Sequence, residues 1–114
     1  MATKQPPQDQ PQPTYTLVEI TLTGNNFNYA PGYLQVHRGD TVAFKCNRAF
    51  TVKFLYGTPF GTVTTFYSSV IDGTSDTGTV AATTALQVYH YTVTATDDTG
   101  VIHLDGGCPT IDVL

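Results

Sequence analysis

The stretch LQVYHYTVTAT, residues 86–96, decides the fold class of this chain. Its odd-numbered residues from Tyr89 to Ala95 are aromatic or aliphatic, and its even-numbered residues from His90 to Thr96 are polar. Successive side chains of a β-strand point to opposite faces, so this period of two predicts a half-buried strand. We expect one continuous strand here, the longest in the chain.

The same alternation recurs on both sides of this stretch. It predicts further strands at residues 15–23, 33–37, 41–46, 50–54, 63–67, 101–104 and 109–114. Turn residues separate them, including Asn25-Asn26 and the run Asp97-Asp98-Thr99-Gly100, and no segment shows helical periodicity. The pattern predicts an all-β sandwich of seven to eight strands.

Length and composition limit the organisation and the partners of the chain. Its 114 residues suit a single domain, with residues 1–13 as a disordered Pro- and Gln-rich tail and residues 14–114 as one sandwich. Charged residues make up only 12% of the chain, and the net charge is -4. Five Lys and Arg residues cannot form a basic stripe, so we expect no binding to nucleic acid or to an anionic membrane surface.

The start of the chain shows no secretory signal. The first residues contain no apolar core segment, and the apolar runs of the chain are too short to span a bilayer. Taken as it stands, the sequence predicts a cytoplasmic protein.

Three stretches, taken in order, resemble cupredoxins. Residues 27–44 are similar to that family's opening, in which an extended segment with a proline precedes a Val-x-x-Gly-Asp-Thr-Val-x-Phe strand. Residues 47–54 are similar to its Asn…His-x-Val-x-Phe segment, and residues 88–93 to its Tyr-x-Tyr-x-Cys strand. The resemblance, which runs from residue 27 to about residue 114, implies a cupredoxin-like Greek-key β-sandwich.

The copper ligands of that family are absent here. A blue-copper site needs two His, one Cys and usually an axial Met. By the resemblance these positions fall on Phe50, Val93, Thr96 and the region of Gly100-Val101. The resemblance therefore implies the fold without copper, electron transfer or another cofactor, and it predicts that Phe50, Val93 and Thr96 belong to a filled core.

The two cysteines, Cys46 and Cys108, leave three alternatives open. In the first alternative the two cysteines form a disulfide, which would stabilise the fold by about 4 kcal/mol in the chain-entropy model. They remain separate thiols, one of them buried as a small apolar group. Or they converge with His103 on a metal ion, although no Cys-x-x-Cys spacing supports such a site.

No catalytic motif stands out, so we expect a protein that is not an enzyme. Gly-x-Ser-x-Gly is absent, and a turn explains Asp97-Asp98 more simply than a catalytic carboxylate pair does. We therefore expect a non-enzymatic binding or assembly module, acting on a protein partner or by homo-oligomerisation through open sheet edges. Four aromatic residues outside the clear strands either supply a contact patch or pack in the core, which is the more common use of such residues: Tyr56, Phe60, Phe66 and Tyr67. The alternative is a metal-binding or redox protein using Cys46, His103 and Cys108.

Overall fold

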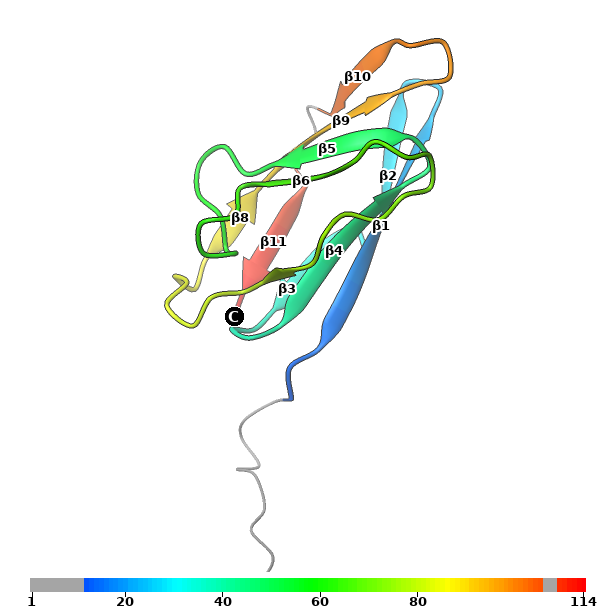
Figure 1. Ribbon diagram of the computed structural model, residues 1–114. Coiled ribbons are helices and arrows are strands. Elements are labelled where there is room, and N and C mark those ends of the chain that lie inside the picture. Colours follow the sequence, from blue (N-terminus) through cyan, green and yellow to red (C-terminus); the bar gives the residue numbers. More distant parts are fainter. Residues whose placement is uncertain (1–11, 106–108) are drawn as a thin grey trace, which may run out of the picture.

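A computed structural model describes residues 12–105 and 109–114, which form eleven strands and no helix (Figure 1). The first sheet contains, in spatial order, β2 (Asn26–Ala30), β1 (Tyr15–Thr23), β4 (Thr41–Cys46) and β7 (Gly78–Thr79). The second contains β10 (Ile102–Asp105), β9 (Thr92–Thr96), β5 (Ala49–Lys53) and β6 (Thr65–Ser68). The third contains β3 (Tyr33–Val36), β11 (Thr110–Val113) and β8 (Val88–His90). No helix of this part of the chain could cross a membrane.

Strand β1 organises the first sheet. It pairs antiparallel with β2 and parallel with β4, where Val18 lies beside Phe44. The buried Asp40 carboxylate holds the start of β1 in place, because it accepts hydrogen bonds from the backbone N–H groups of Thr14 and His37, both at 2.9 Å. The predicted inward faces of β1 and β4 are confirmed, since their alternate apolar residues are buried.

The expected single strand at residues 86–96 is wrong in its continuity, its start and its length: the strand begins only at Val88, and the longest described strand is β1, with nine residues. The chain forms two strands there, because Tyr91 lies at a break where the backbone leaves the third sheet for the second. The Tyr91 N–H donates to the Pro109 carbonyl (3.0 Å), β8 pairs with β11, and β9 pairs with β5 and β10. The predicted inward face from Tyr89 to Ala95 is confirmed, since all four odd-numbered residues are buried.

The strand count also exceeds the expected seven to eight. The break at Tyr91 adds one strand, the segment before Pro31 forms β2, and β7 lies where no strand is predicted. The strand expected at residues 63–67 is β6, shifted to Thr65–Ser68. Of the predicted tail, only Gln12 and Pro13 are among the described residues, and both are exposed.

An aromatic cluster joins the sheets. The ring of Phe44 in β4 lies 5.1 Å from that of Phe66 in β6 and 5.4 Å from that of Tyr91, and Phe60 lies 5.0 Å from Phe66. Of the two alternatives open for Phe60 and Phe66, a contact patch or core packing, the structure therefore shows core packing. Gly78 in β7 packs against this cluster, and a Cβ there would come within 2.6 Å of the Phe66 ring.

Replacing Phe44 tests the cluster. Phe44→Ala would leave a cavity among Phe66 and Tyr91, so we expect the free energy of unfolding in urea to fall by about 3–5 kcal/mol. Leu55→Ala, at a side chain that is 59% exposed, should change it by less than about 0.5 kcal/mol. Equal losses in the two variants would contradict this description of the core.

Candidate functional site

The second sheet has one buried side and one exposed side, and we call the exposed side the outer face. The strand registers arrange its residues in rows that cross the sheet. One row contains Leu104, Thr94, Thr51 and Tyr67, from β10, β9, β5 and β6 in turn. The next row contains Ile102, Thr96 and Ala49. The outer face is thus a sequence of short, regular rows on a pleated surface.

The composition of the outer face follows from the alternation in its strands. Residues such as Val93 and Val52 are fully buried, so their neighbours must point outward. Threonines fill the middle of the face, where a β-branched side chain packs well on a pleated surface. Apolar groups lie at its two edges: Ile102 and Leu104 on β10 are 68% and 65% exposed, and Tyr67 on β6 is 66% exposed.

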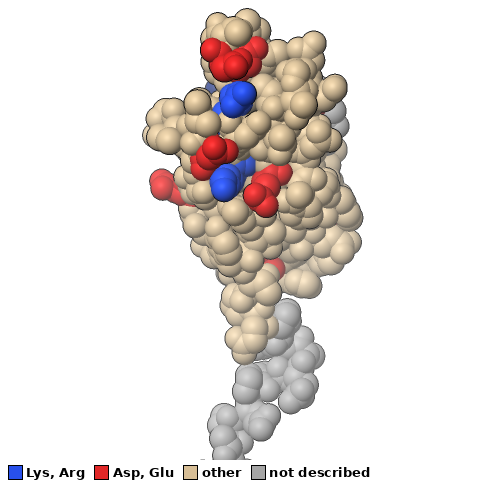
Figure 2. Space-filling view, turned by 90° about the vertical axis from the view of Figure 1, so that its right-hand side faces the viewer, with Lys and Arg blue, Asp and Glu red and all other residues tan. Residues whose placement is uncertain are grey.

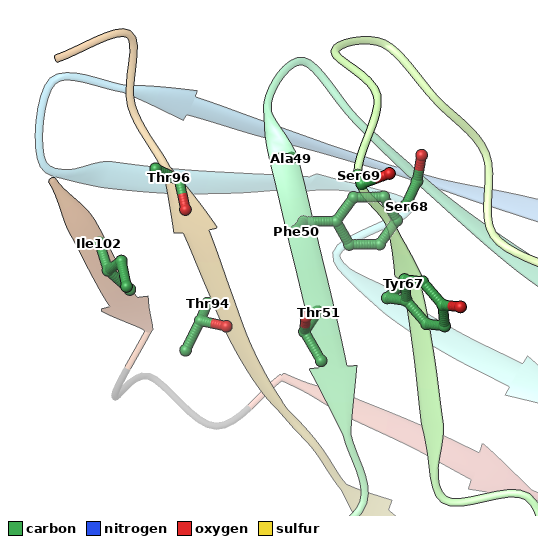
Figure 3. A pocket seen from close by; sticks show the side chains of 9 residues that line it. All are labelled: Ala49, Phe50, Thr51, Tyr67, Ser68, Ser69, Thr94, Thr96 and Ile102. Carbon is green, nitrogen blue, oxygen red and sulfur yellow. The ribbon is translucent and has the colours of Figure 1, made fainter. Parts of the chain in front are cut away.

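A shallow hollow of about 300 Å³ lies on this face. Its lining comes from four neighbouring strands and the loop after β6, as Figure 3 shows: Ala49, Phe50, Thr51, Tyr67, Ser68, Ser69, Thr94, Thr96 and Ile102. Among these described residues the polar groups are hydroxyls, with no carboxylate, imidazole, amine or thiol. The hollow can therefore offer apolar contact and hydrogen bonds to a bound surface.

Three of the four positions that the resemblance aligns with copper ligands lie on β5 and β9, and they divide between the two sides of the sheet. Phe50 and Val93 are buried in the core, as expected. Thr96 is not part of a filled core, because the alternation of β9 turns it to the outer face, where it is half-buried and lines the hollow. The Ala95 side chain faces inward, and successive side chains of a strand point to opposite faces, so Thr96 must face outward.

His103 is bound to a carboxylate of its own hairpin. Its Nε2 lies 2.8 Å from Asp97 Oδ2, while Asp97 Oδ1 accepts hydrogen bonds from the backbone N–H groups of Thr99 and Val101, both at 2.9 Å. The hydrogen bond with His103, followed by those with Thr99, holds the pKa of Asp97 well below its usual range. The predicted turn at residues 97–100 is confirmed, and Gly100 in it has a φ of +87°.

Cys46 is a buried free thiol at the end of β4. Burial raises the pKa of this thiol, which keeps it protonated and weakly nucleophilic. A free Cys46 favours the alternative of separate thiols. Cys108 lies outside the described residues, so the disulfide and the site combining Cys46, His103 and Cys108 stay predictions for experiment. Within residues 12–105 and 109–114, no group of three His, Cys, Asp or Glu side chains could hold a metal ion.

A tyrosine–carboxylate contact that the sequence pattern did not indicate links the edges of two sheets. The Tyr29 hydroxyl in β2 donates a hydrogen bond to the Asp105 carboxylate in β10. Burial, with Asp105 as the next cause, raises the pKa of Tyr29, so the hydroxyl keeps its proton. The two residues are 76 positions apart, and no local period or spacing relates them.

Charged side chains are sparse on the side of the molecule shown in Figure 2. They gather in its upper part with both signs interleaved, and the lower part is almost free of them. No continuous basic surface is visible from this side, in keeping with only five Lys and Arg in the chain.

The Asp97 carboxylate should make folding depend on pH. Because its pKa is lower in the folded state than the value of about 3.9 for an unfolded chain, the charged form stabilises the fold. This contribution is complete well above pH 3.9 and is lost as the pH falls through the lowered pKa. Asp97→Asn should therefore destabilise the protein more at pH 7 than at pH 2.5 in urea unfolding.

Asp98→Asn is the matched control for that experiment, because it removes the neighbouring carboxylate and changes the net charge equally. A stability difference between Asp97→Asn and the wild type that is the same at both pH values would show that the His103–Asp97 contact does not stabilise the charged carboxylate.

The state of the cysteines can be read from their alkylation. Since Cys46 is a free buried thiol, we expect unreduced native protein to leave it unlabelled, and denatured, unreduced protein to take up two alkyl groups by mass spectrometry. No uptake after denaturation, with two groups added once a reductant is present, would instead establish a Cys46–Cys108 disulfide.

No protein-family model matches the chain, and a comparison with curated proteins finds no match either.

Proposed function

We propose that the chain is a non-enzymatic binding module whose contact surface is the outer face of the second sheet. The observation that carries the proposal is the arrangement of exposed Ile102, Leu104 and Tyr67 around a threonine-lined hollow. Exposed apolar side chains that gather on one face, rather than lying scattered, mark interaction sites. Tyrosine suits such a site because it offers both an apolar ring and a polar tip.

The proposed partner is a protein. Of the five Lys and Arg residues only Lys53 belongs to the strands of this face, which is too few for phosphate-dominated binding to nucleic acid. Threonine hydroxyls can donate and accept hydrogen bonds, and burying them costs less than burying charged groups. The face is thus suited to a neutral, partly apolar protein surface.

The proposed scaffold is a copper-free cupredoxin-like Greek-key sandwich. In support, β1 and β4 pair in parallel, and the chain passes from the first sheet at β4 to the second at β5. Such crossings between sheets are typical of Greek-key sandwiches. The apolar residues Phe50 and Val93 at two of the aligned ligand positions also favour a scaffold without copper chemistry.

Affinity capture with two tagged variants of the protein as baits tests the proposal. Thr94→Arg places a long charged side chain at the centre of the outer face, whereas Thr21→Arg makes the same change on the exposed side of β1 in the first sheet. Each tagged variant, once its fold is verified by circular dichroism, is used to capture proteins from the cells that contain this chain. We expect the Thr94→Arg bait to lose the proteins that the wild type and Thr21→Arg retain. Identical capture by all three baits would contradict the proposal.

A further inference from the structure

Strand β10, with four residues, is a short edge strand whose exposed side chains are aliphatic. Among the strands that the structure describes, it pairs with β9 alone. Natural edge strands are commonly guarded by shortness, by charged side chains such as lysine, by proline or by a bulge. β10 is short and has one carboxylate, Asp105, which accepts a hydrogen bond from Tyr29. β10 has neither lysine nor proline, and Ile102, Leu104 and the preceding Val101 are all exposed aliphatic residues. Within residues 12–105 and 109–114, no other strand covers this edge.

The hairpin geometry shows which backbone groups of β10 are available. The Asp97 N–H donates to the Val101 carbonyl (2.8 Å), and His103 lies opposite Ala95 two residues further on. Hydrogen-bonded residue pairs alternate along an antiparallel ladder. His103 therefore directs its backbone groups to β9, and the N–H and C=O groups of Ile102 and Leu104 point away from it.

We propose that β10 pairs antiparallel with β10 of a second copy of this chain, with Ile102 of each copy opposite Leu104 of the other. The inference goes beyond the proposed function, because the second copy meets the edge of the second sheet and not its outer face. His103 lies at the twofold axis of this arrangement, and the two four-stranded sheets join edge to edge. The pairing is isologous, as a twofold dimer requires.

This register satisfies the backbone and the side chains together. Ile102 and Leu104 are the residues whose N–H and C=O groups point outward, so each pair across the axis can exchange both of its hydrogen bonds. Their side chains lie on the outer face, where directly opposed residues are near neighbours. The aliphatic residues of the two copies then form one continuous apolar patch beside the threonine rows.

The segment that would meet its copy across the axis, Val101 to Leu104, contains no carboxylate, although each chain has a net charge of -4. The nearest carboxylates, Asp97 and Asp105, are already hydrogen-bonded to His103 and Tyr29 of their own chain. Pairing therefore brings no unsatisfied carboxylate to the axis. When two copies of β10 run antiparallel, the outward N–H and C=O groups and the aliphatic side chain of Ile102 in each copy face those of Leu104 in the other.

Cysteine cross-linking tests the register in the full-length chain. Ile102→Cys and Leu104→Cys are made separately in a Cys108→Ser background, and one copy carries a tag so that mixed dimers differ in mass. Opposed Cα atoms would lie about 5.5 Å apart, within disulfide range. Like residues would lie about 7–8 Å apart, mostly beyond that range. When the two variants are mixed, we expect disulfide-linked dimers that contain one copy of each. We expect far fewer linked dimers from either variant alone.

Sedimentation velocity separates this inference from the proposed function. The wild type should dimerise with rising concentration, and Leu104→Lys should weaken dimerisation about tenfold or more. The control Leu86→Lys changes a leucine of similar exposure, 58%, in the loop before β8 and should have no effect. A dimer that Leu104→Lys leaves intact, or cross-linking without preference for the mixture, would overturn the β10 pairing.

A wild type that stays monomeric at high concentration would also overturn the pairing. If the Thr94→Arg bait still lost its captured proteins in that case, the outer face would remain a binding surface for a different protein. If the bait lost nothing either, both proposals would fall.

Discussion

The break at Tyr91 is the constraint on which the rest of the structure depends. The bond from its N–H to the Pro109 carbonyl fixes the point where the chain leaves the third sheet for the second. The Tyr91 ring lies 5.4 Å from that of Phe44 and 5.2 Å from that of Phe54, so the junction is anchored to both neighbouring sheets. Burial raises the pKa of Tyr91, which keeps the side chain neutral within the core. With this point fixed, β9 takes its place between β5 and β10.

The outer face is a direct consequence of that placement. A shift of one residue in the register of β9 would turn Val93 to solvent and Thr94 into the core, so burial of Val93 specifies the register. The threonine rows are thus set by core packing rather than by the function that we propose for them. The open edge of β10 follows from the same arrangement, because the hairpin after β9 returns on the side away from β5.

The sequence pattern predicted the direction of side chains in the strands, which depends on neighbouring residues. It missed strand partners and side-chain contacts that join residues far apart in the chain. Alternation correctly placed Phe44 inside and Thr94 outside, because side-chain direction in a strand is a local property. It did not predict the break at Tyr91, since both strands share one period and only their partners differ. The pattern left a contact patch and core packing both open for Phe66, and the structure packs it on Phe44 from a strand that begins two residues later than predicted. The contact of Tyr29 with Asp105 could be identified only from the three-dimensional structure, because the two residues are 76 positions apart.

Residue-resolved amide hydrogen exchange tests the central claim, that β10 presents the backbone of Ile102 and Leu104 to a second copy. In dilute protein the amides of these two residues should exchange rapidly, while that of His103, which faces β9, exchanges slowly. In concentrated protein the Ile102 and Leu104 amides should become protected and the His103 amide should change little. Slow exchange at Ile102 and Leu104 in dilute solution, or rapid exchange there at every concentration, would contradict the account.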